Sequence, residues 1–349
     1  MTHDEVVLGE LATPRRRWPN ELAQRLLRIR EAGLVAVLAA LVVGTALGRS
    51  SFVSSQNLRN IGQDTAILAL LAIGQTAVLV SRNIDLSVGS VLGLTAFMSG
   101  KLLYSDPHVP IALVFVAGIA SGCALGAANG ALVTIGRIPA LVATLGMLYV
   151  VRGIDYAWAG GQLINANNLP AGFLEIGNSS VIGIPSLVIV AAAVMLAAGY
   201  VMRSYRAGRE LYAVGSNPGA AVLVGIKVSR RTVGAFVFSG ALAGLCGVLW
   251  TSYYGTVDAT AGNGLELQVV AAAVVGGVAI FGGSGSVYGA VLGALVLSVI
   301  SSALVVLRIN AFWEQAIDGT LLVLAIGIDR LLTQRLAGVL RTRGARRAG

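Results

Sequence analysis

The chain reads GRELYAVGSNPGAAVLVGIKV from Gly208 to Val228, within a polar, basic interruption (203–231) between two long apolar stretches. Asn217 is a residue type that caps helices, Pro218 suits a first helical turn, and Gly225 suits a left-handed exit. These signals predict a short helix of its own on the water side of a membrane protein. A loop that only joined two spans would not need such a helix, so we interpret it as a docking element.

The composition places this interruption in a membrane protein. The chain has 349 residues, of which 56% are hydrophobic and 12% charged, and its mean hydropathy is +0.81. Such apolar content belongs in lipid rather than in a soluble core. The net charge of +9 does not indicate nucleic-acid binding, because the basic residues flank apolar spans and are not interleaved with aromatic residues.

The apolar stretches predict an all-α integral membrane protein with about ten transmembrane helices. The predicted spans are 32–48, 61–80, 88–104, 111–134, 138–158, 183–202, 232–251, 266–282, 286–307 and 312–332. This gives a basic cytoplasmic segment 1–31, a transmembrane domain 32–332 that contains the cytoplasmic loop 203–231, and a basic cytoplasmic tail 333–349.

The basic residues predict which side each end occupies. With both termini inside, 20 of the 25 lysine and arginine residues fall on the cytoplasmic side. Positive residues accumulate in cytoplasmic loops, so the distribution predicts an N-in, C-in topology with 203–231 in the cytoplasm. The glycine ladder at 118, 122, 126 and 130 predicts close helix packing.

Several kinds of chemistry receive no support from the sequence. Cys123 and Cys246 lie in apolar stretches, which predicts small core residues rather than a disulfide framework. The chain has no phosphate-binding loop, so ATP chemistry would come from a partner. His3 and His108 are its two histidines, and they make no metal-ligand spacing. We therefore expect no cofactor or metal in this chain and no enzymatic activity.

Polar residues concentrate at membrane depth in SRNIDLSVGS, Ser81–Ser90. In one interpretation Asn83, Asp85 and Ser87 line a polar path along irregular backbone, as buried non-helical segments in membranes do. In the other, Arg82 and Asp85 form an interfacial ion pair and Ser87 caps the next helix. The sequence leaves both open.

Two amides within predicted spans, Gln75 and Asn129, are further candidates for the translocation path. Amides in helical bundles more commonly form hydrogen bonds between helices, and that alternative stays open. An outer group of polar residues contains Asp258, Asn263, Glu266 and Gln268. Glu266 precedes an apolar run and could cap the N-terminus of a helix, where a carboxylate is favourable.

Five runs together resemble the permeases of ribose-type ABC sugar importers, a family that includes ribose, xylose, rhamnose and autoinducer-two permeases. The similarity extends over about residues 50–332. The runs are GQTAVLVSRNIDLSVGSVLGLTAF (Gly74–Phe97), IPALVATLGMLYVVRGI (Ile138–Ile154), GRELYAVGSNPGAAVLVGIKV, GLELQVVAAAVVGGVAIFGGSGSVYGAVLGA (Gly264–Ala294) and LRINAFWEQAIDG (Leu307–Gly319). Within the family, RNIDLSVGS, IPALVATLG and the LRI…FW run are most similar to the autoinducer-two and rhamnose permeases.

This resemblance implies a type II ABC importer-like bundle in the bacterial inner membrane. Its implied partners are cytoplasmic ATPase subunits that carry ATP and Mg, an extracytoplasmic sugar-binding protein, a second permease chain of the same or a different kind, and membrane lipid. It also implies an ATPase-coupling loop, matched here by Gly208, Arg209, Tyr212, Ala213, Gly215, Asn217, Ala220, Ala221, Gly225 and Ile226. Arg59 and Arg152 are isolated cations at the outer ends of spans, for which two interpretations stay open: contact with acidic residues of the binding protein, or contact with lipid headgroups.

Two alternatives belong to other classes or substrates. An ion-coupled secondary transporter would show paired carboxylates deep in the bundle and would not need a capped cytoplasmic helix. A related ABC permease for branched amino acids or nucleosides shares the pattern.

Overall fold

The computed structural model describes residues 20–310, 312–327 and 330 of the chain, with side chains described from residue 32 onward. Of the predicted terminal segments, 333–349 lies outside the described residues. Of segment 1–31, only the backbone from Asn20 is described, and it begins the first helix.

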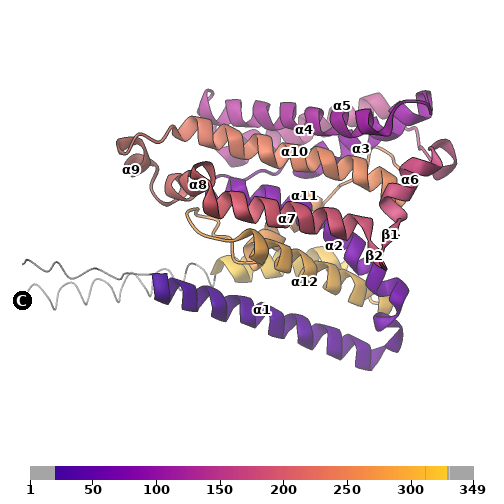
Figure 1. Ribbon diagram of the computed structural model, residues 1–349, viewed down its shortest axis with the longest axis horizontal. Helices are drawn as coiled ribbons and strands as arrows, with labels where there is room; N and C mark the ends of the chain where they lie inside the picture. Colours follow the sequence, from indigo (N-terminus) through magenta and orange to yellow (C-terminus); the bar gives the residue numbers. More distant parts are fainter. Residues whose placement is uncertain (1–19, 311, 328–329, 331–349) are drawn as a thin grey trace, which may run out of the picture.

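Long helices run side by side along one axis and make up the bundle (Figure 1). They are α1 (Asn20–Gly48), α2 (Ser55–Val80), α3 (Val88–Ser105), α4 (Ile111–Thr134), α5 (Ala140–Ala159), α7 (Ser186–Ser204), α10 (Val228–Tyr254), α11 (Leu265–Val275), α12 (Val287–Val306) and a helix at 313–327. Six of them, α2, α4, α5, α7, α10 and α12, are long and apolar enough to cross a membrane, and Ala32–Gly48 and α11 are shorter apolar helices. This confirms an all-α membrane protein.

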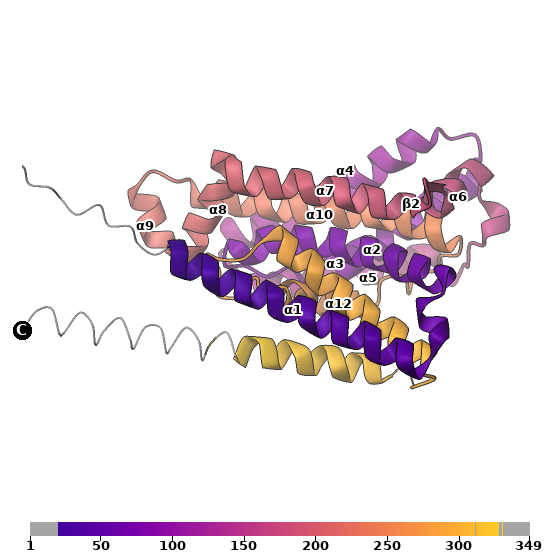
Figure 2. The same ribbon diagram turned by 60° about the horizontal axis from the view of Figure 1, so that its bottom comes forward.

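Short elements mark the two ends of the bundle. At one end lie α6 (Ala171–Asn178) and a small hairpin of β1 (Ser180–Val181) with β2 (Ile184–Pro185). At the opposite end lie α8 (Arg206–Ser216) and α9 (Pro218–Leu223). The remaining short helices are η1 (Ser50–Val53) and η2 (Ala166–Asn168). Figure 2 shows the helix at 313–327 on the outside of the bundle, beside α1 and α12.

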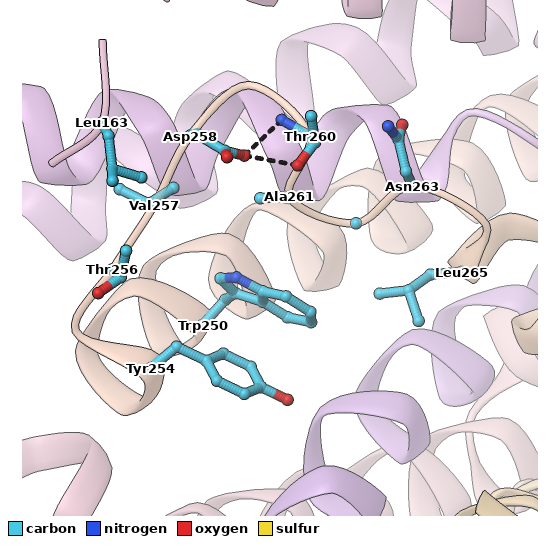
Figure 3. Close-up of a pocket in the computed structure, with 11 residues that line it drawn as sticks. Leu163, Trp250, Tyr254, Thr256, Val257, Asp258, Thr260, Ala261, Asn263 and Leu265 are labelled. Atoms are coloured by element: carbon cyan, nitrogen blue, oxygen red, sulfur yellow. Dashed lines mark hydrogen bonds between the residues drawn. The ribbon is translucent and has the colours of Figure 1, made fainter. Parts of the chain in front are cut away.

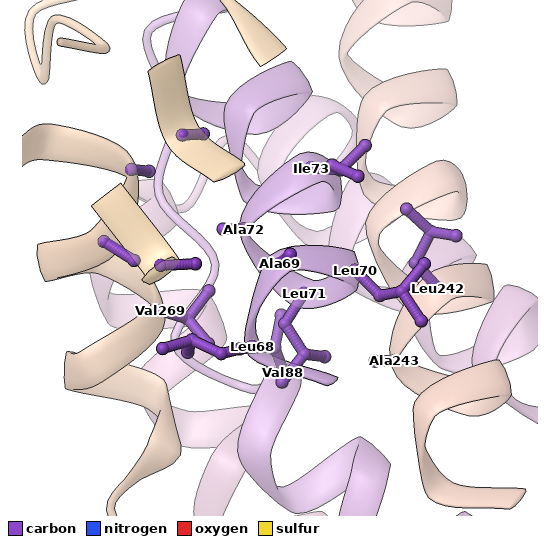
Figure 4. Packing of buried hydrophobic residues seen from close by; sticks show 14 of the residues in the cluster. Leu68, Ala69, Leu70, Leu71, Ala72, Ile73, Val88, Leu242, Ala243 and Val269 are labelled. Carbon is purple, nitrogen blue, oxygen red and sulfur yellow. The ribbon is translucent and has the colours of Figure 1, made fainter. Parts of the chain in front are cut away.

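Helix α2 forms the centre of the bundle. Its residues from Ala66 to Val80 are all buried, in contact with α7, α10, α11 and α12. Figure 4 shows Leu68–Ile73 of this helix between Leu242 and Ala243 of α10 on one side and Val269 of α11 on the other. A helix that is apolar all round is a buried helix, and α2 follows that rule.

Glycines allow α4 and α10 to pack against each other at backbone distance. A Cβ atom at Gly122 would lie 2.0 Å from the carbonyl oxygen of Gly240, and one at Gly240 would lie 2.1 Å from that of Gly122. Only small residues permit such an approach, which in lipid supplies much of the association energy. The predicted role of the glycine ladder is thereby confirmed.

The eighth predicted span is wrong at its end. We expected 266–282, but α11 stops at Val275 and the chain returns through a loop to α12. The reason is conformational: Gly277, Gly282, Gly283 and Gly285 all have positive φ, which a continuous helix excludes. This loop lies at the end of the bundle that carries α8 and α9.

Candidate functional site

The short helix α9 forms as the sequence predicts. Asn217 is its N-cap, and the side-chain oxygen of Asn217 accepts a hydrogen bond from the Ala220 N–H at 3.0 Å. Pro218 occupies the first turn, where a missing N–H costs nothing, and Gly225 leaves the helix with φ at +79°. Asn217, Pro218 and Gly225 therefore begin and end α9 as predicted.

The exposed face of α9 differs from the expected one. We expected Ala221 to face away from the bundle, but Ala221 is only 3% exposed. Helix α9 packs back on α8 and α10, and the Ile226 N–H donates to the Ala221 carbonyl at 3.0 Å. The apolar side chains that point outward belong to Val222, Leu223 and Val224, which are 61%, 88% and 75% exposed.

The ten residues predicted for coupling fall into three groups by burial. Arg209, Ala213, Asn217, Ala220 and Gly225 are exposed, Tyr212 and Ile226 are half-buried, and Gly208, Gly215 and Ala221 are buried. The buried members fix α8 in place. A Cβ atom at Gly208 would lie 2.3 Å from the Met202 Cα at the end of α7, so α7 and α8 meet there without a side chain between them.

Helix α8 is also tied to the loop that follows α11. The Tyr212 hydroxyl donates to the Gly285 carbonyl at 3.1 Å, and the Gly283 N–H donates to the Val80 carbonyl at the end of α2 at 2.9 Å. Gly215 packs against the same Val80 carbonyl. The C-terminal end of α2 is thus held between α8 and the 276–285 loop.

A carboxylate joins α8 to the start of α10. Glu210 accepts hydrogen bonds from the Nε atoms of Arg206 and Arg231, both at 2.5 Å. These two bonds, that from Arg206 first, lower the pKa of the Glu210 carboxyl from its ordinary value. The carboxylate therefore stays charged at neutral pH and links α8 to α10 through its ion pair with Arg231.

Directly beyond Val80, the chain turns into the buried network around Asp85. Its Oδ1 accepts hydrogen bonds from the Ser87 N–H (3.0 Å) and hydroxyl (2.7 Å), and its Oδ2 accepts one from the Ser239 hydroxyl (3.0 Å). The Asn129 Nδ2 in turn donates to the Ser87 Oγ at 2.7 Å. The network joins the start of α3 to α4 and α10.

Gln75 completes the network from α2. With its Nε2 facing the Asp85 carbonyl, the Gln75 amide donates to that oxygen (3.1 Å) and accepts from the Asp85 N–H (3.2 Å). Gln75, Asp85, Ser87 and Asn129 are each at most 1% exposed. Asn83 stands apart, half-buried and bonded to Ser81. The structure thus gathers four of the five residues predicted for the path into one network inside the chain.

The alternative interpretation of this segment is not supported in its details. Within the described part of the chain, no ion pair joins Arg82 to Asp85, and Arg82 is exposed with φ at +67°. Ser87 occupies the N-cap position of α3, but its hydroxyl donates to Asp85 and makes no cap bond. Asn129 of α4 bonds to Ser87 at the N-cap of α3, as the interhelical alternative predicts. Gln75 of α2 bonds instead to the backbone of Asp85, in the non-helical segment between α2 and α3.

At the opposite end, the last turns of α10 and the loop 256–263 line an open cavity of about 420 Å³ (Figure 3). The Trp250 and Tyr254 rings lie 4.4 Å apart and form one wall. Asp258 holds the loop by accepting from the Thr260 N–H (2.8 Å) and hydroxyl (2.6 Å). Sequence analysis found Asp258 and Asn263 here but missed the aromatic pair, whose i, i+4 spacing was the available signal.

A second cavity of about 200 Å³ adjoins the first and shares Trp250, Tyr254 and Leu265 with it. The Tyr254 hydroxyl donates to Asp64 at 3.0 Å, and the Gln268 Nε2 donates to Glu314 at 3.1 Å. The two linings contain three carboxylates, those of Asp64, Asp258 and Glu314, and no lysine or arginine among the described residues. The joined cavities offer many hydrogen-bond acceptors beside two aromatic rings.

Arg59 and Arg152, which we expected to contact a binding protein, form hydrogen bonds within the chain. Arg152 is 6% exposed, and its Nη1 donates to the carbonyls of Ala261 (2.7 Å) and Ala259 (3.1 Å). The expectation for Arg152 is wrong, because a buried guanidinium that holds its own chain cannot reach a partner's surface. Arg59 is half-buried and donates to the Asn178 carbonyl at the end of α6.

These features define a multi-pass, all-α membrane protein with a braced helical element at one end and a polar, aromatic-walled cavity at the other. The chain belongs to the family described as the permease component of branched-chain amino acid transport systems, whose model matches residues 57–326. It is therefore a transport protein of the bacterial inner membrane.

Similar proteins carry more specific names. The autoinducer 2 import system permease protein LsrC of Enterobacter sp. (strain 638) is 38% identical over 312 residues, which are 89% of this chain and 90% of that protein. The LsrC proteins of Klebsiella pneumoniae and Escherichia coli O157:H7 are 39% and 37% identical, with 89% and 85% of this chain covered and 90% and 85% of their own lengths. No solved structure matches the chain.

Proposed function

We propose that the chain is the membrane-spanning permease subunit of an ATP-driven, binding-protein-dependent importer for a small sugar-like molecule of the autoinducer-two, rhamnose or ribose type. The observation that carries this proposal is the exposed apolar triplet Val222–Val224 on α9, presented at the end of a braced helix. An apolar helix face that enters a groove is a common way for one protein to hold another. The similarity to autoinducer 2 import permeases supports the substrate class.

In this proposal the chain crosses the membrane about ten times, with both ends and the α8–α9 element in the cytoplasm. Four crossings are added to the six long apolar helices: α1, α3, the helix at 313–327, and the short helix α11 together with the loops on either side of it. The partners are cytoplasmic ATPase subunits, which carry ATP and Mg, a second permease chain and an extracytoplasmic binding protein.

Force from the ATPase would reach the bundle through the contacts of α8. A displacement of α9 moves α8, and α8 touches the Val80 carbonyl through Gly215 and the 276–285 loop through Tyr212. Val80 lies five residues before Asp85, so the motion arrives directly at the buried network. The two permease chains would then rock against each other and open the path between them alternately to each side.

We propose two roles in the path. Gln75, Asp85, Ser87 and Asn129 fix the helices that border the path, while Asn83, which is half-buried and outside that network, faces the path itself. The outer cavities receive the substrate first. Their carboxylates accept hydrogen bonds from hydroxyl groups, and the Trp250 and Tyr254 rings offer flat apolar faces to a sugar ring.

The same lining bears on the branched-amino-acid alternative. An amino acid carries an ammonium group and a carboxylate, and the described linings offer no lysine or arginine to bind that carboxylate. The cavity chemistry therefore favours a neutral, hydroxyl-rich substrate over an amino acid.

The decisive experiment changes Leu223 to Asp in the assembled transporter. A charged side chain at this position should prevent α9 from seating, since an unpaired charge is costly to desolvate. We expect normal amounts in the membrane, loss of the ATPase partner on purification and loss of substrate uptake. Ala221→Glu is a less suitable change, because the buried Ala221 would also disturb α9 itself.

A matched control is Ile182→Asp, since Ile182 is 96% exposed at the tip of the hairpin at the opposite end. That variant should retain the ATPase. Wild-type retention and uptake in the Leu223→Asp variant would overturn the proposal. Uptake by the permease alone, driven by an ion gradient without ATP, would establish the secondary-transporter alternative instead.

A further inference from the structure

An apolar groove of about 480 Å³ lies where α7, α8 and α10 meet. Its walls are the aliphatic and aromatic side chains of Val194, Ala198 and Met202 on α7 and of Ala235, Phe238 and Leu242 on α10. These residues occupy the half of each helix next to α8, which is the cytoplasmic half in the proposed topology. An apolar groove that opens at this depth of a membrane is filled by hydrocarbon rather than by water.

Two arginines, Arg230 and Arg231, line the groove at the end where α10 begins, and they differ in whether an acidic residue pairs with them. Arg231 is paired with Glu210 at 2.5 Å, and Glu210 is shared with Arg206. Arg230 is exposed, and no ion pair to it occurs among the described residues. The groove therefore combines an apolar body with an uncompensated guanidinium at its cytoplasmic mouth.

We propose that this groove binds an anionic phospholipid of the inner leaflet, with one acyl chain between α7 and α10 and the phosphate on Arg230. Basic pockets between membrane helices on the cytoplasmic side are suited to anionic headgroups, and arginine forms strong bonds to phosphate oxygens. The acyl chain supplies the apolar contacts that the protein leaves unmade.

The bound lipid would also act on α8. Ala207, Gly208 and Leu211 of that helix line the same groove, so an acyl chain there supports α8 from the membrane side. On its other side α8 contacts Val80 and Gly285. Lipid occupancy therefore stabilises the position of α8 between the bundle and the cytoplasm.

The structure supplies a variant that blocks the groove without a clash. Gly234 lines it, and a Cβ atom there would meet nothing within 4 Å, so Gly234→Leu fills the space that the acyl chain would take. Gly146→Leu in α5 is the matched control, because its Cβ position is equally open and lies away from the groove. For the headgroup, Arg230→Gln is compared with Arg137→Gln, a change of another exposed arginine.

The test is native mass spectrometry of the full chain with phosphatidylglycerol, together with its melting temperature in detergent as this lipid is added. We expect Gly234→Leu and Arg230→Gln each to lower apparent affinity for the first bound phosphatidylglycerol by about fivefold, and the controls to behave as wild type. In lipid-free detergent all four variants should melt as the wild type does, which separates lost binding from lost folding.

Three outcomes would overturn the proposal. One is wild-type phosphatidylglycerol binding in both groove variants. Another is equal stabilisation by phosphatidylcholine, which would remove the role of Arg230. The third is a cross-link from a cysteine at the exposed Ala197 to a second permease chain, which would show that protein covers the groove.

Discussion

Gly215 of α8 packs directly on the carbonyl group of Val80 at the end of α2: a Cβ atom at position 215 would lie 1.8 Å from that oxygen. The same oxygen accepts the Gly283 N–H at 2.9 Å. Two segments distant in sequence therefore meet at one peptide group, directly before the turn that leads to Asp85. This contact joins α8 to the segment that leads into the buried network.

Gly215→Ala should uncouple the two ends of the transporter. The added methyl group forces α8 away from Val80, an overpacking that costs about 1–3 kcal/mol. We expect the variant to retain its ATPase while substrate no longer stimulates ATP hydrolysis. Gly219→Ala is the control, because the Cβ atom there would sit 3.4 Å from its nearest neighbour. Stimulation of the Gly215→Ala variant to the wild-type level would show that this contact does not transmit motion.

The topology can be tested by labelling single cysteines in a background without Cys123 and Cys246. Ser204, Ser216 and Asn165 are all exposed and accept a cysteine without loss of packing. We expect an impermeant thiol reagent added to intact cells to label position 165 but not 204 or 216, because the basic residues concentrate around 203–231. Labelling at 216 from outside would contradict the N-in, C-in topology.

Asp85→Asn should destabilise the bundle rather than only slow transport. Both Asp85 oxygens accept hydrogen bonds, so an amide nitrogen in place of either oxygen removes the acceptor of the Ser87 N–H or of the Ser239 hydroxyl. A buried donor left unpaired costs about 1–3 kcal/mol. The measurement is a lower melting temperature in detergent together with reduced uptake. A variant that melts as the wild type but does not transport would assign Asp85 a direct role in the path instead.

Arg152 and Arg59 should give different results when each is changed to Gln. Arg152→Gln leaves the Ala259 and Ala261 carbonyls without their donor and should loosen the loop over the outer cavity, with a lower melting temperature and a raised KM for uptake. Arg59→Gln should act chiefly on α6, whose end Arg59 contacts. Protease sensitivity of the 256–263 loop distinguishes them. A melting temperature unchanged by Arg152→Gln would contradict the structural role of Arg152.

The ion pairs of Glu210 with Arg206 and Arg231 predict that the stability of the fold depends on pH in a definite direction. The hydrogen bonds from Arg206 and Arg231 lower the pKa of Glu210 in the folded state. These contacts therefore stabilise the fold fully above the unfolded pKa of about 4.3, and this stabilisation is lost as the pH falls through the folded pKa. The melting temperature of wild type should exceed that of Glu210→Gln at pH 7, and the gap should close in acid. A gap that is independent of pH would show that the contact is not electrostatic.

The sequence by itself determined the features that depend on local chemistry. Apolar length fixed most membrane helices, and the Asn217 and Gly225 signals fixed the ends of α9, since capping involves atoms only a few residues apart. The glycine ladder correctly indicated close packing of α4, although not that α10 is its partner.

Only the tertiary structure decided which faces are buried. Ala221 and Arg152 looked available for partners, yet both are enclosed, because burial depends on what distant segments pack against them. The meeting of Gly215 with Val80, and of Asp85 with Ser239, joins residues more than a hundred positions apart, for which no local pattern exists. The sequence indicates that a polar residue in a membrane needs a partner, but the packing of the helices determines which partner it has.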